Sequence, residues 1–170
     1  MDHDKIIEQL FHHISIVKSI TDGMLNRQAG WKPSREDWSV LEIINHMVDE
    51  ERDDFRARLR LALEDPEATW PPIDPEGWAK ERNYNKRDFK QSLSNFFDER
   101  KFSVSWLKEL DSPDWKSAGI HPKIGPMSAE QVLVNWLAHD LLHIRQILAV
   151  QWAYLAYTVD PVSLDYAGSL

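Results

Sequence analysis

Two histidines in the last third of the chain have the spacing of a metal-binding pair. They are His139 and His143, in the run His139-Asp140-Leu141-Leu142-His143. Residues four apart on a helix lie on the same face, with Cβ atoms about 5–6 Å apart. Both imidazoles can therefore reach one ion at about 2.0–2.1 Å. The same spacing also occurs in ordinary buried helices, so a metal site needs support from a further ligand.

A third ligand must come from elsewhere, because a catalytic zinc-type site uses three protein ligands and keeps one position open. The candidates are His12, His13, His46 and His121. His46 falls on the flank of the apolar stripe of its helix, where it can face a neighbouring helix. Helix geometry leaves His46, His12 and His13 as alternatives, whereas His121 precedes Pro122 in a predicted loop.

Two further side chains near these histidines are candidates for a role at the site. Glu50 follows His46 by one helical turn and could accept a hydrogen bond or act as a general base. It belongs to a charged run, however, and we interpret it as an exposed carboxylate on a solvated helix face. Trp136 lies one turn before Asp140 on the histidine side, and we expect it to form a wall of the metal pocket. The sequence assigns no catalytic acid or base.

The histidine pair belongs to a stretch from Ser128 to Tyr154 that is apolar almost all round. Such a pattern is typical of a helix buried at the centre of a bundle. Ser128 with Gln131 has the spacing of a capping box at the start of this helix. Ser39 with Glu42 has the same spacing at the start of an earlier helix, which contains His46.

Two more helices complete the predicted set, at about Asp4–Asn26 and Lys86–Leu110. Apolar residues recur at helical spacing in both segments, and we find no strand-like alternation. Four helices of about 20 residues or more, joined by two long loops, predict an all-α protein built as a four-helix bundle.

The connection between the second and third helices is rich in proline, which no regular helix accommodates at this density. The prolines are Pro66, Pro71, Pro72 and Pro75. Because the segment also contains Trp70 and other apolar residues, we expect a packed crossover loop that covers one end of the bundle. We expect a short helix from Glu76 to Asn83 and a loop from Asp111 to Met127.

Length and composition limit the class of protein. The 170 residues predict one domain spanning residues 1–170, and the net charge of −8 argues against a nucleic-acid surface. There is no cysteine, which excludes disulfides, thiolate metal ligands and a cysteine nucleophile. The chain begins without a signal-peptide pattern and has no run of about 18 apolar residues. We therefore expect a cytoplasmic protein that does not span a membrane.

The apolar content of the first and last helices exceeds what a four-helix core needs. The chain also has eight tryptophans, a residue that is favoured at protein interfaces. We therefore expect a homodimer.

Two segments resemble motifs of the DinB-like proteins. They are Trp38–Met47, which reads WSVLEIINHM, and His139–Ile147, which reads HDLLHIRQI. The resemblance covers nearly the whole chain and implies a four-helix bundle, commonly a homodimer, with a divalent metal that is often nickel or zinc. It assigns three histidines as the metal ligands, namely His46, His139 and His143. It also suggests that Gln146 contacts a bound thiol or water.

Studied relatives in that family include S-transferases and isomerases that use low-molecular-weight thiols such as bacillithiol, mycothiol or glutathione. The leading hypothesis is therefore a metal-dependent enzyme with a small-molecule substrate, which transfers a thiol or, in a second version, activates water for hydrolysis. The alternative is a non-catalytic stress-response or ligand-binding bundle with a structural metal. Three visible ligands favour an open, catalytic site, whereas the lack of an identifiable acid or base favours the alternative.

Overall fold

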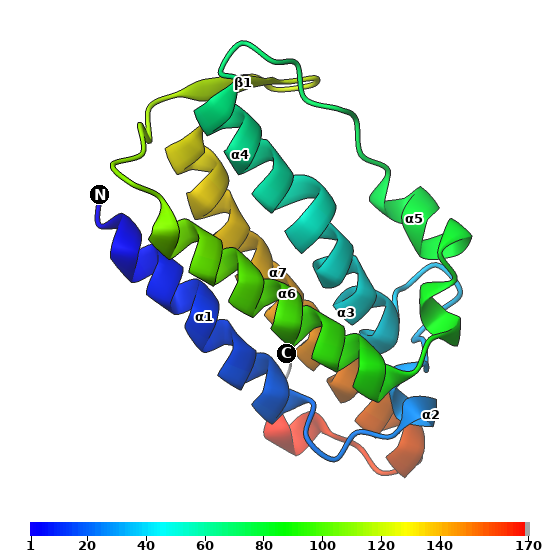
Figure 1. Ribbon diagram of the computed structural model, residues 1–170. Helices are drawn as coiled ribbons and strands as arrows, with labels where there is room; N and C mark the ends of the chain where they lie inside the picture. The colour runs from blue at the N-terminus through cyan, green and yellow to red at the C-terminus, as the bar shows by residue number, and fades with distance from the viewer. Residues whose placement is uncertain (169–170) are drawn as a thin grey trace.

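Four long helical segments lie side by side in the computed structural model, which describes residues 1–168 (Figure 1). The predicted four-helix bundle is thus confirmed. The segments are α1 (His3–Ile20), the continuous run α3 (Val40–Asp49), η1 (Glu50–Phe55) and α4 (Arg56–Glu64), then α6 (Phe89–Glu109) and α7 (Ala129–Val159). Both α1 and the run from α3 to α4 pack against α6 and α7.

Both predicted capping boxes are present. The Ser39 hydroxyl accepts from the backbone N–H of Glu42 (3.1 Å), and the Glu42 carboxylate accepts from the backbone N–H of Ser39 (2.9 Å). Ser128 and Gln131 make the same reciprocal bonds at the start of α7. These bonds satisfy donors that a helix start leaves unpaired, and so they fix where α3 and α7 begin.

The crossover between α4 and α6 runs back along the bundle, because these two helices point in the same direction (Figure 1). It starts at one end, where Trp70 is buried and its backbone N–H donates to the carbonyl of Ile120 (2.9 Å). It continues beside α3 as α5 (Pro75–Glu81) and η2 (Tyr84–Lys86). The predicted short helix is therefore present, but the crossover covers a side of the bundle as well as its end.

Two loop regions differ from the sequence expectation. The first helix ends at Ile20 rather than near Asn26, because Gly23 adopts a positive φ of 70°, and the short helix α2 (Asn26–Ala29) follows. The predicted loop before α7 contains an antiparallel hairpin of β1 (Ala118–His121) and β2 (Gly125–Ser128). Strands of four residues are too short to show a clear alternation of polar and apolar residues.

A buried polar layer divides the core into two apolar clusters. Its centre is Arg100, which is 1% exposed and donates to Glu51 (2.8 Å) and Asp140 (2.8 Å). Arg100 also donates to the carbonyl of Leu10 (2.9 Å), and His13 lies 2.8 Å from Asp140. The layer therefore links all four helical segments by charge-assisted hydrogen bonds.

The turn of η1 is a π-helix, which is wider than the α-helical turns on either side. Glu50, Glu51 and Asp54 of this turn are all buried, as is Asp49 just before it. The charged run was expected to form a solvated face, so that expectation is wrong for these four carboxylates. The π turn matters for function because it lies beside the histidine pair of α7.

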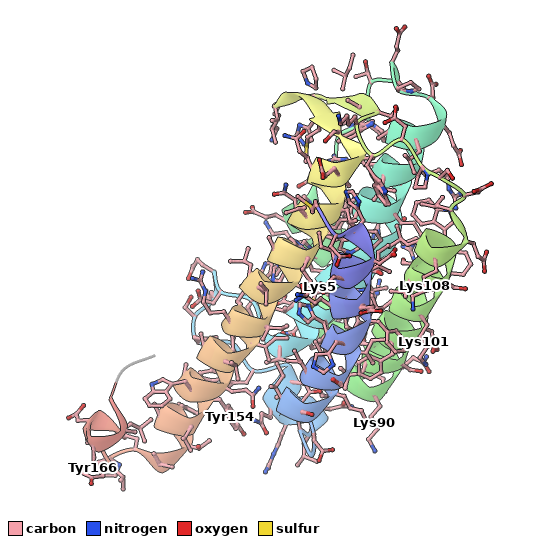
Figure 2. The ribbon with its side chains drawn as sticks, turned by 90° about the vertical axis from the view of Figure 1, so that its left-hand side faces the viewer. Lys5, Lys90, Lys101, Lys108, Tyr154 and Tyr166 are labelled. Carbon is pink, nitrogen blue, oxygen red and sulfur yellow. The ribbon has the colours of Figure 1, made fainter. Side chains whose placement is uncertain are left out.

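The last helix, α7, is the longest, with 31 residues. Its final turns, near Tyr154, extend past the other helices, and the short helix η3 (Asp165–Ala167) with Tyr166 lies beyond them (Figure 2). Several large apolar side chains of α7 are exposed, among them Leu142, Leu155 and Tyr157. Of the helices in residues 1–168, none is long and apolar enough to cross a membrane.

Candidate metal centre

Three histidines from two helices meet between α3 and α7. His46 comes from the last turn of α3, and His139 and His143 come from the middle of α7. The Nε2 atom of His139 lies 3.2 Å from that of His46 and 3.0 Å from that of His143. Two nitrogens bound to one ion at about 2.0–2.1 Å with tetrahedral angles lie about 3.3 Å apart. The spacing of the ring nitrogens therefore fits one shared ion.

The protonation of these rings also suits metal binding. Burial, together with repulsion from His143 and His139, lowers the pKa of His46 to about 2. Burial and the nearby His143 lower the pKa of His139 to about 3, and burial likewise lowers the pKa of His143. The rings are neutral at pH 7 and each has a nitrogen lone pair to offer. Three lone pairs that converge repel one another, and a cation between them removes that repulsion.

Neighbouring side chains hold each ring in place. The ring of Trp38 packs against His46 with centroids 4.8 Å apart, and that of Phe55 packs against His139 at 5.0 Å. The Nδ1 atom of His143 lies 2.8 Å from the Gln146 amide oxygen, which accepts its hydrogen. That bond leaves the Nε2 atom of His143 unprotonated and free to bind an ion.

Glu50 is buried beside the triad, and it is not the exposed carboxylate that we expected. It is 4% exposed, and its Oε1 atom lies 3.8 Å from Nδ1 of His46, which is beyond hydrogen-bonding distance. Neither atom has a hydrogen-bond partner among the described residues. Burial and the adjacent Asp54 raise the pKa of Glu50 well above its usual value. A bound cation would favour its ionised form.

Trp136 does not form the expected wall of the pocket. Its side chain is buried in the core, where its ring stacks on Phe55 at 5.6 Å and its Nε1–H donates to Glu51 (2.9 Å). The ring therefore supports Phe55 from behind, and Phe55 in turn contacts His139. The indole N–H explains this position, because a buried donor needs a partner and the core carboxylate supplies one.

The other candidate histidines lie away from this centre. His13 is engaged with Asp140 in the polar layer, and His12 is exposed on α1. The Nδ1 atom of His121 accepts from the backbone N–H groups of Lys123 and Ile124, both at 3.1 Å, in the hairpin turn. The structure thus brings His46, rather than His12 or His13, to the pair on α7.

The triad opens into a cavity of about 660 Å³. Its apolar walls include Trp38, Ile73 and Leu142, while Glu50 and Gln146 lie beside the histidines. Four exposed carboxylates and one lysine also line it, and we call the carboxylates the acidic rim: Glu36, Asp37, Asp74 and Glu76. The lysine is Lys123 of the hairpin turn. A small molecule can therefore reach the ring nitrogens through a mouth of net negative charge.

The fold and site define a four-helix bundle with an open three-histidine centre. The chain matches the family model of the DinB superfamily over residues 9–147, a range that includes all three histidines. This protein therefore belongs to the DinB superfamily.

Two individual proteins are similar to the chain. A protein from Oceanobacillus iheyensis with the name "Putative metal-dependent hydrolase OB0782" is 24% identical over 135 residues, which cover 79% of this chain and 77% of that protein. The solved structure of YfiT from Bacillus subtilis, described as "a probable metal-dependent hydrolase with an unusual four-helix bundle topology", superposes with a TM-score of 0.79. It is 20% identical, and the match covers 88% of this chain and 86% of YfiT. At that identity, the likeness to YfiT shows the fold.

Proposed function

We propose that this protein is a metal-dependent enzyme in which His46, His139 and His143 bind one divalent ion, zinc or nickel. The observation that carries this proposal is the convergence of three neutral Nε2 atoms at a cavity of about 660 Å³. Structural zinc sites are closed by four protein ligands, whereas catalytic sites have three and an open position. Three histidines beside an open cavity match the catalytic arrangement, which counts against a purely structural metal in a binding bundle.

A divalent ion in such a site supplies positive charge and an open position, where a water or thiol loses its proton more readily. The chain's own residues hold the ligands in the required state. Gln146 keeps the proton of His143 on Nδ1, and Trp38 and Phe55 hold the other two rings by packing.

Hydrolysis by activated water is the version that we favour. The buried carboxyl of Glu50, 3.8 Å from His46, is close enough to take part in moving a proton from a water in the cavity. The acidic rim also disfavours entry of anionic thiols such as glutathione. Two similar proteins carry names of metal-dependent hydrolases, which supports the same version.

Transfer of a small thiol is the second candidate. The chain has no cysteine, so a sulfur nucleophile would have to come from a cofactor such as bacillithiol. The resemblance to the DinB-like proteins supports this version, because studied relatives in that family include thiol-dependent S-transferases. The cavity is also large enough for such a molecule.

One set of assays distinguishes hydrolysis from thiol transfer. The purified protein is analysed for metal content and then assayed with a panel of esters and amides, and with bacillithiol or glutathione plus a reactive aryl halide. We expect one ion per chain and turnover in the hydrolytic panel, both lost in His139→Ala and both retained in the exposed control His12→Ala. Thiol transfer without hydrolysis would establish the second candidate. A protein that binds neither zinc, nickel nor cobalt would refute the proposal altogether.

A further inference from the structure

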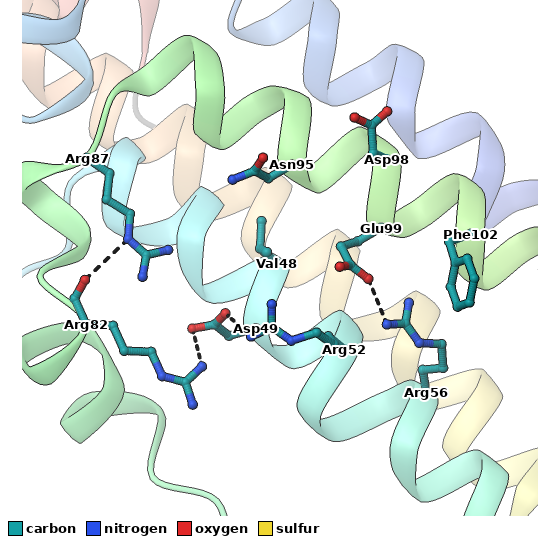
Figure 3. Close-up of a pocket in the computed structure, with 10 residues that line it drawn as sticks. All are labelled: Val48, Asp49, Arg52, Arg56, Arg82, Arg87, Asn95, Asp98, Glu99 and Phe102. Atoms are coloured by element: carbon teal, nitrogen blue, oxygen red, sulfur yellow. Dashed lines mark hydrogen bonds and ion pairs between the residues drawn. The ribbon is translucent and has the colours of Figure 1, made fainter.

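A second cavity, of about 720 Å³, lies on the side of α3 and η1 that faces α6 (Figure 3). Four arginines line it, two from the helical run of η1 and α4 and two from the crossover, and we call it the arginine cavity. They are Arg52 of η1, Arg56 of α4, Arg82 at the end of α5 and Arg87 after η2. The metal cavity shares none of its lining residues.

A buried carboxylate beneath the cavity fixes two of these arginines. Asp49, which is 2% exposed, accepts from Arg52 (3.0 Å) and Arg82 (2.6 Å), and also from the Tyr84 hydroxyl. The guanidinium of Arg82 also lies over the Trp78 ring, 4.3 Å from its centroid. A guanidinium has five N–H donors, and these contacts use only some of them. Further donors of Arg52 are taken by Asp53 (2.8 Å), and Arg82 donates to the same carboxylate (3.0 Å) from the nitrogen that contacts Asp49. The other donors of Arg82 are held in place and available to a ligand.

Arg87 brings a positive charge that no carboxylate in residues 1–168 pairs with. Its Nε–H donates to the backbone carbonyl of Arg82 (3.3 Å), and one terminal nitrogen donates to the Asn45 side-chain oxygen (2.9 Å). Its guanidinium also lies 5.0 Å from the centroid of the Tyr84 ring. Both acceptors are neutral and the ring gives only a cation–π contact, so the charge of Arg87 is oriented but not neutralised.

The acids that line the cavity do not offset all four cations. Asp49 is engaged beneath Arg52 and Arg82, and Glu99 pairs with Arg56 (2.7 Å). Asp98 points away from Arg82 and Arg87 in Figure 3 and pairs with Lys101 (3.2 Å). Asp53 also pairs with both Arg52 (2.8 Å) and Arg82 (3.0 Å). The region around Arg87 therefore keeps one unpaired positive charge within a protein whose net charge is −8.

The far end of the cavity offers one exposed aromatic ring. Phe102 is 57% exposed there, and the guanidinium of Arg56 lies 4.7 Å from its ring centroid. Val48 lies between this end and the positive region (Figure 3). A ligand that fits this arrangement has an anionic group at one end and an apolar or aromatic part at the other.

We propose that the arginine cavity binds a small organic anion, whose phosphate or carboxylate group contacts Arg82 and Arg87 while its apolar part packs on Phe102. Planar guanidinium groups recognise both kinds of anion through paired N–H donors. The alternative is a set of ion pairs that hold the crossover against α3 and bind no ligand. The cavity and the unneutralised Arg87 favour a ligand.

The test measures binding of matched probes by calorimetry at low ionic strength. The probes are phenyl phosphate, phenylacetate, inorganic phosphate and the neutral benzyl alcohol, and each is titrated into both metal-loaded and metal-stripped protein. We expect saturable one-to-one binding of phenyl phosphate in both forms and no binding of benzyl alcohol. The stronger of phenyl phosphate and phenylacetate identifies the anionic group. Binding that disappears when the metal is stripped would place the anion at the metal centre and overturn the proposal.

Variants locate the site. Arg87→Gln should weaken phenyl phosphate at least about tenfold, whereas Arg60→Gln, an exposed arginine on α4 that faces Glu64, should not change it. Phe102→Ala should weaken phenyl phosphate but not inorganic phosphate. Shifts of the Arg87 and Arg82 Nε–H signals in nitrogen-edited NMR spectra of wild-type protein give a readout that does not depend on the folding of any variant. The proposal would be refuted if Arg87→Gln and Arg60→Gln weakened phenyl phosphate binding equally. It would also be refuted if the Arg87 and Arg82 signals did not shift at saturation.

Discussion

Replacing Gln146 with Ala should weaken zinc binding about tenfold without changing the fold. The Gln146 amide oxygen accepts the Nδ1 hydrogen of His143 at 2.8 Å even without an ion, so the bond exists on both sides of the binding equilibrium. Only its strengthening on metal binding contributes to affinity. A neutral hydrogen bond contributes about 0.5–1.5 kcal/mol and one to a charged group about 1.5–3 kcal/mol. The difference of about 1–1.5 kcal/mol corresponds to a factor of about 5–12.

The assay is competition for zinc against a fluorescent chelator of known affinity. Gln151→Ala is the matched control, because Gln151 lies on the same helix and donates to the Ile20 carbonyl (2.7 Å) but does not line the metal cavity. Gln146→Glu retains an acceptor and should retain the affinity or raise it. Wild-type affinity in Gln146→Ala, or equal losses in Gln146→Ala and Gln151→Ala, would show that the contact to His143 does not support a ligand.

Four further outcomes are expected. His139→Ala should lose stoichiometric metal while its circular dichroism spectrum stays helical, and a full complement of metal would refute the triad. Arg100→Leu should lower the free energy of unfolding by about 3–5 kcal/mol, because it removes the guanidinium that pairs with the buried carboxylates of Glu51 and Asp140. Urea titration measures this change, and the exposed control Arg60→Leu should alter the free energy of unfolding by less than about 0.5 kcal/mol. Burial alone would raise the pKa of Asp140, but Arg100 holds that pKa below its usual value. The stabilisation from the ion pair of Asp140 with Arg100 is therefore present above about pH 4, and it is lost as the pH falls through the lowered pKa. Cobalt-loaded protein should bind cysteamine more tightly than the anionic 3-mercaptopropionate, because the acidic rim repels an anion. Titration of the sulfur-to-cobalt absorption band measures the affinity for each thiol. Equal affinities would show that the acidic rim does not select between them. Light scattering should give a homodimer of about 40 kDa, twice the chain mass of 19.9 kDa, because α7 exposes large apolar side chains; a monomer at micromolar concentrations would refute this.

Features that depend on residues close together in the chain could be predicted from the amino-acid sequence. The capping boxes at Ser39 and Ser128 fixed the starts of α3 and α7, because a cap involves residues only three positions apart. The spacing of His139 and His143 placed both rings on one face of α7 for the same reason. Apolar periodicity predicted the four helices and hence the bundle.

Contacts between residues far apart in the chain depend on how the helices pack. The packing of α3 against α7 selected His46 over His12 and His13, which the sequence could separate only through its resemblance to a family. Within the charged run, the turn at Glu50–Phe55 packs against α6 and α7, which cover side chains that the sequence alone places on a charged helix face. Glu50 is therefore buried beside the triad, although its sequence context is that of a solvated surface.

The arginine cavity shows most clearly what local patterns omit. Its four arginines come from η1, α4, the end of α5 and the segment after η2, and the returning crossover brings the last two beside α3 (Figure 3). Along the chain Arg52, Arg82 and Arg87 each have an acidic neighbour, and nothing in the local sequence distinguishes them from ordinary surface cations. A cavity depends on the relative placement of whole segments. The charge pairing in this one depends on contacts between residues as far apart in the chain as Asp49 and Arg82. Those contacts have no signature in spacing, and only the folded chain determined them.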